Sequence, residues 1–222
     1  MSRFDLIIFD CDGTLVDSEL LNNASTSEVL AEAGYLKYTT EYCLEAFIGC
    51  GQSMVWEVAA AESGKPVPAD INQRFIDRVA QNMDAMARPA PGIAAVLEAL
   101  SKTHKICVGS NGERPNVVGC LKSTGLLRFF PQDCIFTVED IVNPKPAPDL
   151  YLYAAQKMGF TPDRCAVVED SIAGATAGVA AGMKVFGYYG LAHQPEQQAE
   201  KLRTLGVHQV SAQLADLLAF VK

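Results

Sequence analysis

Short apolar runs alternate with segments of helical periodicity along most of the chain. The first run, residues 4–9, is apolar at all positions but one and predicts a buried strand. After residue 88 the pattern predicts strands at 105–109, 134–138, 165–168 and 184–188, with helices at 93–100, 115–124, 147–158 and 172–181. The tail, 195–222, predicts a helix, a short strand and a helix. Strands that alternate with helices predict an α/β fold, in which a parallel sheet has helices on both faces.

The segment from 17 to 88 differs from the rest, because it has helical periodicity and predicts no strand. Its first helix, 18–33, has Asp17 or Ser18 as a candidate cap and Gly34 as a stop signal, and a cluster of Pro and Gly follows at 88–92. We therefore expect an α/β core of residues 1–16 and 89–222 and an all-helical inserted domain of residues 17–88. An insertion directly after a strand overhangs the edge where parallel sheets bind ligands, so we expect it to act as a lid.

The composition indicates an ordinary globular protein with an acidic balance. Of the 222 residues, 49% are hydrophobic and 20% are charged, and the formal net charge is −8. This charge argues against nucleic acid or an anionic membrane as a partner, whereas a small anionic substrate remains compatible because a bound metal ion can reverse the local charge.

The cysteines and the first apolar run bear on location. The 7 cysteines form no CxxC pair, which indicates reduced thiols, and the first apolar run is too short for a signal peptide or a membrane span. We expect a cytoplasmic protein, and a monomer because no interface pattern stands out.

The first candidate site is Asp10-Cys11-Asp12-Gly13-Thr14, directly after the predicted first strand. Asp10 and Asp12 are two residues apart, so their side chains point the same way on an extended chain. Two convergent carboxylates suit a divalent cation, and they also suit a division of roles between a nucleophile and a general acid and base. Gly13 permits a tight turn whose backbone N–H groups can hold phosphate oxygens, so Gly13 and Thr14 beside it are candidate phosphate-binding residues. An ordinary Asp-Gly turn is the alternative.

The second candidate site is Ser110-Asn111-Gly112, at the end of the predicted strand 105–109. A hydroxyl, an amide and free backbone groups all suit a phosphoryl oxygen, so Ser110 and Asn111 are candidate phosphate-binding residues. A helix cap or an Asn-Gly turn is the more frequent explanation of such a sequence.

The third candidate is Lys145, which lies between Pro144 and Pro146. Prolines on both sides stiffen the backbone and restrict where the lysine points. A lysine is a compact positive charge that suits a phosphoryl group or an ionised aspartate. An exposed lysine ahead of a helix is an equally good interpretation of this segment alone.

The fourth candidate site is Glu169-Asp170-Ser171, at the end of the predicted strand 165–168. Two acids at the end of a buried strand are costly unless they are paired or bound to a metal. Adjacent side chains diverge on a regular strand, so we expect Asp170 to be a direct metal ligand and Glu169 to bind the metal directly or through water. The alternative is an Asp or Ser cap of the next helix, a role for which Ser171 is available.

Together these motifs place carboxylates, a cation and phosphate-binding groups at the carboxyl ends of neighbouring predicted strands. With them, the chain resembles the haloacid dehalogenase superfamily, and within it the beta-phosphoglucomutase-like phosphatases with a small helical cap. The resemblance covers nearly the whole chain and rests on residues 10–19, Ser110-Asn111, residues 145–149, and residues 169–171 with Gly174, Gly178 and Gly182.

The resemblance implies a Rossmann-like core, a cap domain and a Mg²⁺-dependent phosphatase that forms an aspartyl phosphate. Asp10 would be the nucleophile, and Asp12 the general acid and base. Ser110 and Lys145 would hold the phosphoryl group of a small phosphate ester. The magnesium ligands would be Asp10, Asp12 through its backbone carbonyl, Glu169 and Asp170.

The cap sequence favours a phosphatase over the related mutases. In the loop 47–53, where Gly49 and Gln52 are candidate substrate contacts, Gln52 stands about where the mutases carry an Arg for a second phosphate. Val16 and Asn22 also replace a Thr and a His of those mutases. We expect hydrolysis of a sugar phosphate or sugar-acid phosphate. A beta-phosphoglucomutase-type mutase and a catalytically silent regulator with the same fold are the alternatives.

Overall fold

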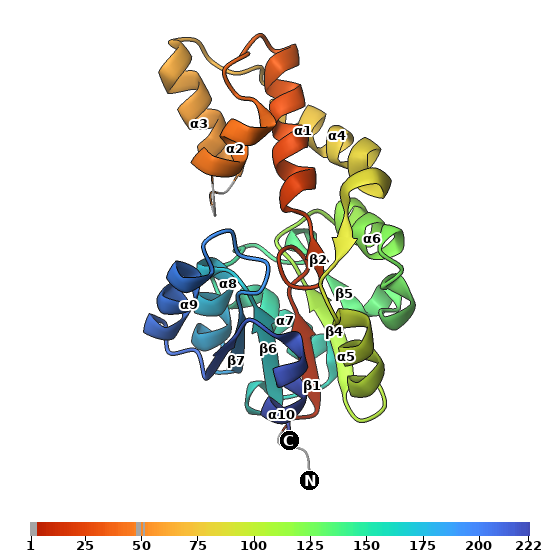
Figure 1. Cartoon of the computed structure of the whole chain (residues 1–222). Coiled ribbons are helices and arrows are strands. Elements are labelled where there is room, and N and C mark those ends of the chain that lie inside the picture. Colours follow the sequence, from red (N-terminus) through yellow and green to blue (C-terminus); the bar gives the residue numbers. More distant parts are fainter. Residues whose placement is uncertain (1–3, 48–49, 51) are drawn as a thin grey trace. The chain divides into compact units, whose positions relative to one another are not determined.

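The computed structural model describes residues 4–47, 50 and 52–222, and the chain divides into two compact units (Figure 1). The α/β unit comprises Met1–Asp17 and Arg88–Lys222, and the helical unit comprises Ser18–Ala87. Each unit has a hydrophobic core of its own. The helical unit is shorter by one residue at each end than the predicted insertion.

A six-stranded sheet forms the centre of the α/β unit, with the strand order β5-β4-β1-β6-β7-β8. Its strands are β1 (Leu6–Phe9), β4 (Lys105–Gly109), β5 (Ile135–Phe136), β6 (Cys165–Glu169), β7 (Lys184–Tyr188) and β8 (Gln209–Ser211). All pairs in this sheet are parallel, and β1 lies between β4 and β6. The predicted α/β fold class with a parallel sheet is confirmed.

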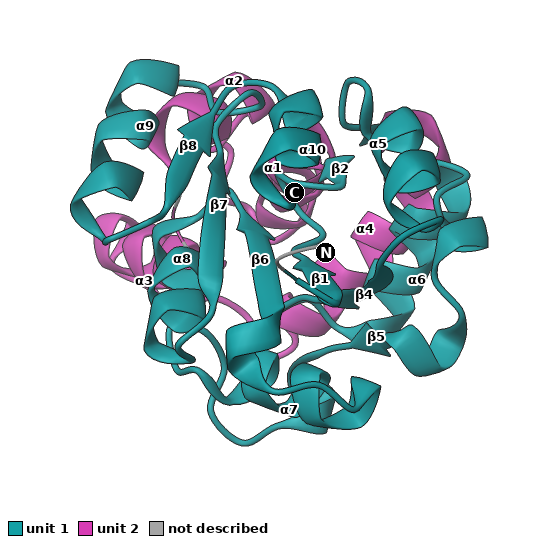
Figure 2. Cartoon of the chain, turned by 90° about the horizontal axis from the view of Figure 1, so that it is seen from below, with its two compact units in different colours: residues 1–17, 88–222 teal, residues 18–87 magenta. Residues whose placement is uncertain are grey.

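Helices cover both faces of this sheet (Figure 2). One face carries α7 (Asp149–Met158), α8 (Ile172–Ala180) and α9 (Pro195–Thr204), and the other carries α5 (Ile93–Leu100), α6 (Arg114–Ser123) and α10 (Leu217–Phe220). Side chains alternate along β1, so Leu6 and Ile8 join the core under α7 and α8, while Phe9 meets the ring of Phe130 edge-on. Burial on both faces explains why this strand is continuously apolar.

The strand β5 is shorter than the predicted strand 134–138. It is flanked by the 3₁₀ helices η2 (Gln132–Cys134) and η3 (Val138–Asp140). The Asp140 carboxylate accepts hydrogen bonds from the backbone N–H of Thr137 at 2.8 Å and from the Arg114 guanidinium at 2.5 Å. These bonds favour a turn where the apolar pattern alone predicts more strand.

A two-stranded antiparallel ribbon, β2 (Val16–Asp17) with β3 (Arg88–Pro89), was not predicted from the sequence. Two residues are too few to show a period of two, and Pro89 has no backbone N–H to donate, so nothing in the local sequence indicates a strand. The ribbon joins the two chain segments between which the helical unit is inserted.

The helical unit consists of α1 (Glu19–Glu32), α2 (Thr40–Ala46), α3 (Gln52–Ser63) and α4 (Ile71–Met86). The first helix ends before Gly34, which has a φ of +83° and so takes the left-handed conformation expected of a stop signal. The core of the helical unit is largely apolar and aromatic, comprising Val29, Leu30, Tyr35, Tyr38, Cys43, Phe47, Val55, Trp56, Ala59 and Ile71.

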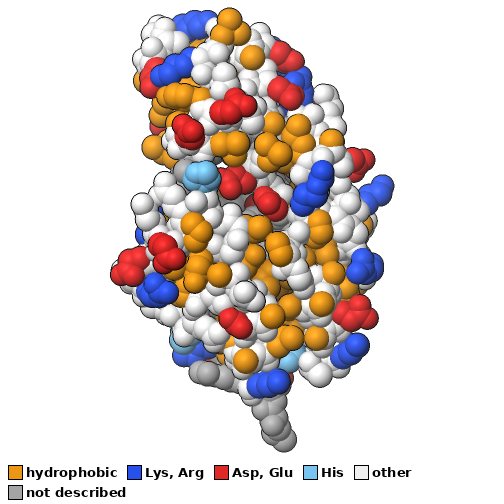
Figure 3. Space-filling model, in the orientation of Figure 1, with side chains coloured by type: hydrophobic (Ala, Val, Ile, Leu, Met, Phe, Trp, Pro, Cys, Tyr) orange, Lys and Arg blue, Asp and Glu red, His pale blue; other side chains and the backbone are white. Residues whose placement is uncertain are grey.

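One face of the molecule shows the mixed charge of an ordinary globular protein. On the face in Figure 3, acidic and basic side chains are interspersed. Among the described residues, every helix is too short or too polar to cross a membrane.

Candidate active site

Three carboxylates meet at the carboxyl edge of the sheet. One oxygen atom of each of Asp10, Glu169 and Asp170 lies within 4.8 Å of the other two. Asp10 follows β1, and its backbone N–H donates to the carbonyl of Val168 on β6 at 3.0 Å, so the pairing of the two strands extends to the acid. Adjacent parallel strands end at the same edge, which brings together acids that are far apart in the sequence.

Lys145 lies inside this acidic cluster. Its Nζ is 2.6 Å from Asp10 Oδ1 and 2.7 Å from Glu169 Oε1, and its side chain is only 3% exposed. Burial raises the pKa of Asp10 to about 8, although Lys145 opposes that rise. Burial and the neighbouring acids also raise the pKa of Asp170 well above its ordinary value. Lys145 therefore compensates only part of the negative charge, and such a site favours a cation.

Both oxygens of the Glu169 carboxylate are engaged within the protein. Oε1 accepts from Lys145 Nζ at 2.7 Å and from the Tyr151 hydroxyl at 2.9 Å. Oε2 accepts from the backbone N–H of Ser171 at 2.8 Å and from its hydroxyl at 2.9 Å. The Ser171 hydroxyl in turn accepts from the backbone N–H of Gly174, so it caps α8 as anticipated. These contacts hold Glu169 in one orientation, with four donors on two oxygens.

Two glycines leave the space in which the acids lie. A Cβ atom on Gly174 would lie 1.5 Å from Glu169 Oε1, and a Cβ atom on Gly13 would lie 2.2 Å from Asp170 Oδ2. Gly13 also has a φ of +77°, a backbone conformation that residues other than glycine rarely adopt. The glycine of the first motif and the first glycine of α8 therefore allow close approach of backbone and carboxylate.

Asn111 contacts the main chain of Lys145. The backbone N–H of Lys145 donates to Asn111 Oδ1 at 3.0 Å, and Asn111 Nδ2 donates to the Lys145 carbonyl at 3.1 Å. The side-chain amide thus links the segment after β4 to the backbone at Lys145, a role that the sequence did not predict. A phosphate contact through Asn111 stays a prediction.

Ser110 and Asp12 lie at the same edge as the acidic cluster. Ser110 is buried, and its hydroxyl accepts from the backbone N–H of Gly112 at 3.0 Å. A Cβ atom on Gly112 would lie 3.2 Å from Ser110 Oγ and 3.7 Å from Asp12 Oδ2, so the second acid of the first motif faces the second motif. Asp12 is partly exposed, which leaves it accessible for proton exchange.

Three contacts at the site were missed by the sequence analysis. Tyr151 donates to Glu169, the Thr14 hydroxyl donates to Asp170 Oδ1 at 3.2 Å, and Gln198 Nε2 donates to the backbone carbonyl of Asp170. Tyr151 occupies an apolar position of a helix, which by pattern alone indicates a core residue. Gln198 lies on a polar helix far along the chain, with no local signal of this contact.

Of the two candidate substrate contacts in the inserted segment, Gln52 is among the described residues and Gly49 is not. Gln52 is the first residue of α3, and its amide exchanges hydrogen bonds with the Thr26 hydroxyl on α1 at 3.1 and 3.5 Å. Within the helical unit, this side chain therefore links two helices.

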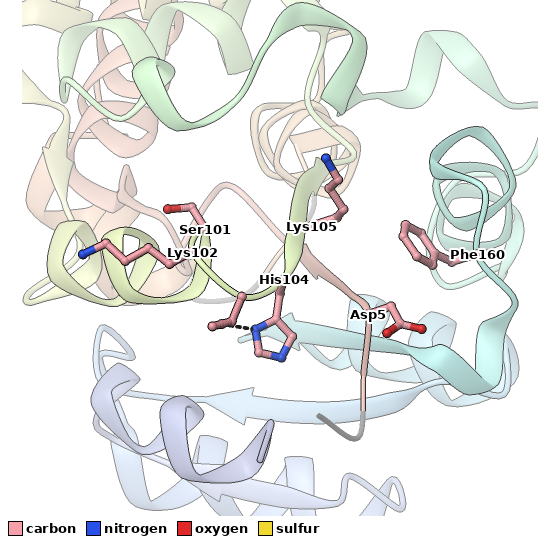
Figure 4. Close-up of a pocket in the computed structure, with 7 residues that line it drawn as sticks. Asp5, Ser101, Lys102, His104, Lys105 and Phe160 are labelled. Carbon is pink, nitrogen blue, oxygen red and sulfur yellow. Dashed lines mark hydrogen bonds between the residues drawn. The ribbon is translucent and has the colours of Figure 1, made fainter. Parts of the chain in front are cut away.

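A hollow of about 420 Å³ lies at the opposite edge of the sheet, next to the amino ends of β1 and β4 (Figure 4). It is lined by Asp5, Ser101, Lys102, Thr103, His104, Lys105 and Phe160. The amino groups of Lys102 and Lys105 point in different directions, and the His104 ring is engaged by the Thr103 hydroxyl at 2.8 Å. We therefore place the candidate active site at the acidic cluster, where charged groups converge.

Comparison with known proteins identifies the class of protein to which this parallel sheet with its acidic cluster belongs. Residues 7–188 match the haloacid dehalogenase-like hydrolase family, and the chain belongs to this family.

Curated relatives and a solved structure give further detail. The chain is 33% identical over 187 residues to 6-phosphogluconate phosphatase of Escherichia coli K12, which covers 84% of this chain and 83% of that protein. It is 29% identical over 185 residues to the fructose-1-phosphate phosphatase YqaB of the same organism, which covers 82% and 94%. A solved HAD family hydrolase from Deinococcus radiodurans R1, with bound phosphate and sodium, has a TM-score of 0.76 and 32% identity over 99% of this chain and 96% of that one. The predicted class, a phosphoric monoester hydrolase, is confirmed by these relatives.

Proposed function

We propose that the chain is a Mg²⁺-dependent phosphatase of a small sugar phosphate or sugar-acid phosphate, with Asp10 as the nucleophile. The observation that carries this proposal is the contact of Lys145 Nζ with Asp10 Oδ1 at 2.6 Å inside a cluster of three carboxylates. A lysine in this place holds the nucleophilic carboxylate in one orientation and keeps a positive charge beside the incoming phosphoryl group.

The donor set fits a hard divalent cation, because it consists of carboxylate oxygens at a site with uncompensated negative charge. Asp10 and Asp170 are the proposed direct ligands, together with the backbone carbonyl of Asp12. Since Glu169 already accepts four hydrogen bonds, we propose that it acts on the metal through water and holds Lys145 in place. When bound, Mg²⁺ would offset the charge of the acids and of the phosphoryl oxygens.

The residues then divide the reaction into two steps. A carboxylate oxygen of Asp10 attacks phosphorus, the bond from phosphorus to the leaving oxygen breaks, and Asp12 gives that oxygen a proton. Asp12 next takes a proton from a water molecule, which attacks phosphorus and breaks the bond to Asp10. Inorganic phosphate leaves and Asp10 is restored. Throughout, Lys145 and Ser110 hold the phosphoryl oxygens.

The substrate class rests on the relatives, two of which are named phosphatases of 6-phosphogluconate and of fructose 1-phosphate. We propose that the helical unit serves as the cap over the sugar part of the substrate. Gln52 lacks the charge needed to grip a second phosphate, which supports hydrolysis over a mutase reaction.

The proposal is tested by phosphate release from a panel of sugar phosphates and sugar-acid phosphates with Mg²⁺, beginning with the two named above. The key variant is Asp10→Asn, which keeps the shape of the side chain and removes its nucleophilic charge. The control is Asp133→Asn, an identical change at an exposed site. We expect release by the wild type and the control, and a loss of at least about a thousandfold in Asp10→Asn.

Other outcomes discriminate between the alternatives. Full activity of Asp10→Asn contradicts the proposed nucleophile. Conversion of a beta-sugar 1-phosphate to its 6-phosphate, without release, indicates a mutase. Binding of Mg²⁺ without turnover of any ester indicates a silent regulator.

A further inference from the structure

Tyr151 is a fully buried residue of α7 whose hydroxyl reaches the acidic cluster. We propose that Tyr151 is a positioning residue for Lys145, acting through Glu169. This inference rests on the proposed function, in which Lys145 holds the transferring phosphoryl group. The role assigned to Tyr151 is therefore indirect, because its printed side-chain contacts at the site are with Glu169 and Lys145.

The hydroxyl of Tyr151 shares one acceptor with the lysine. It donates to Glu169 Oε1 at 2.9 Å, and Lys145 Nζ donates to the same oxygen at 2.7 Å. A phenol is protonated at neutral pH, so the Tyr151 hydroxyl is the donor in this contact. The negative charge of that oxygen is therefore divided between a neutral donor and a charged one.

The ring of Tyr151 provides a second contact with the lysine. Lys145 Nζ lies 4.7 Å from the ring centroid, a geometry in which the ammonium is attracted by the aromatic face. The ring lies close to the backbone of β4. A Cβ atom on Gly109 would lie only 3.3 Å from the Cε1 atom of Tyr151 and 3.3 Å from Ile8 Cγ2. Glycine at the end of β4 thus lets the ring approach the strand closely.

The contacts of Tyr151 affect how the ammonium group of Lys145 distributes its hydrogen bonds. Lys145 has three N–H groups, and two of them already point to Asp10 and Glu169. Loss of the Tyr151 hydroxyl removes one donor from Glu169, which then attracts the ammonium more strongly. Lys145 is drawn toward Glu169 and away from the phosphoryl oxygen that its third N–H would hold.

The test uses Tyr151→Phe, which removes the hydroxyl alone and keeps the ring. Its matched control is Tyr153→Phe on the same helix, where the ring packs edge-on against Phe136. Four quantities are measured with Mg²⁺: kcat and KM on the best ester of the panel, the calorimetric affinity for inorganic phosphate, and the thermal stability. The phosphate affinity needs no turnover, so it reports on Lys145 even if no ester is hydrolysed.

For Tyr151→Phe we expect kcat to fall about five- to twentyfold, KM to stay within about twofold, and phosphate binding to weaken about three- to tenfold. Tyr153→Phe is expected to stay within about twofold of wild type in all of these. If kcat and phosphate affinity of Tyr151→Phe both equal those of wild type, the inference is wrong. A wild type that binds phosphate but hydrolyses no ester contradicts the proposed function instead, and the phosphate affinities then decide the role of Tyr151.

A double-mutant cycle separates positioning from a general structural role. In the Lys145→Ala background, measured with p-nitrophenyl phosphate, Tyr151→Phe is expected to cause no further loss of activity, because the group through which it acts is gone. Equal losses in the presence and absence of Lys145 would mean that Tyr151 acts independently of the lysine, and would overturn the inference.

Discussion

Each unit of the molecule holds a cation between two carboxylates. In the α/β unit, Lys145 Nζ contacts Asp10 and Glu169 at 2.6 and 2.7 Å, and in the helical unit Arg78 contacts Glu28 and Glu32 at 2.7 and 2.5 Å. The geometry of the contacts is similar, but the side-chain exposure is 3% for the lysine and 21% for the arginine.

The pKa of the acid shifts in opposite directions at the buried and at the more exposed site. Desolvation raises the pKa of Asp10 to about 8. At Glu28 the smaller desolvation also acts to raise the pKa, but the hydrogen bonds from Arg78 and Asn82 prevail and lower it. We therefore propose that this pattern of charges holds a metal and a phosphoryl group where water is excluded, whereas it forms an ordinary surface ion pair where water is present.

The largest effect is expected for Lys145→Met, which removes the buried cation and keeps much of its volume. We expect kcat to fall about a thousandfold, because the acids and the phosphoryl group lose the positive charge between them. Unfolding free energy should fall by about 3–5 kcal/mol without Mg²⁺, since buried carboxylates lose their partner. Steady-state kinetics and chemical denaturation measure both, and an unchanged kcat would contradict the role of the lysine.

A smaller loss, about a hundredfold in activity, is expected for Gly174→Ala. Its Cβ atom would lie 1.5 Å from Glu169 Oε1, so the carboxylate must move and release Lys145. Thr176→Ala on the same helix is the control, because Thr176 is partly exposed and its hydroxyl bonds only within the helix at the carbonyl of Ile172. Normal phosphate release by Gly174→Ala would show that the position of Glu169 is unimportant.

Metal binding should stabilise the α/β unit through the acidic cluster. At a Mg²⁺ concentration about 100 times the dissociation constant, the unfolding free energy is expected to rise by about 2.7 kcal/mol. The same addition should have little effect on Asp170→Asn, which lacks one of the proposed ligands. Thermal denaturation with Mg²⁺ and with a chelator measures this difference, and equal stabilisation of the two proteins would place the metal elsewhere.

The smallest effect is expected for Arg78→Met in the helical unit. The loss in unfolding free energy should be below about 1 kcal/mol at neutral pH and should shrink in high salt. Because the folded-state pKa of Glu28 is lowered, the contribution of this pair is present above the unfolded pKa and is lost as pH falls through the folded pKa. Chemical denaturation of the wild type and of Arg78→Met between about pH 7 and pH 3 checks this. A difference in unfolding free energy that stays constant across that range would contradict the ion-pair explanation.

Much of the fold followed from the sequence because the local signals were strong. The apolar runs and the helical periods predicted α5, β4 and β7 with their observed bounds, and the stop signal at Gly34 corresponds to the end of α1. The ribbon of β2 and β3 was missed, because two residues give no period. Asp10 of the first motif was expected to meet Glu169 and Asp170 of the fourth, since parallel strands end at one edge, and these three acids do lie together.

The sequence by itself determined that a parallel sheet forms and that Asp10, Glu169 and Asp170 gather at its carboxyl edge. Both results depend on alternation along the chain and on strand direction, which are local or nearly local properties. Only the tertiary structure decided that Tyr151 donates to Glu169 and that Asn111 links to the Lys145 backbone. Those contacts depend on how closely helices and loops pack against the strand ends, and no periodicity in the sequence encodes that distance.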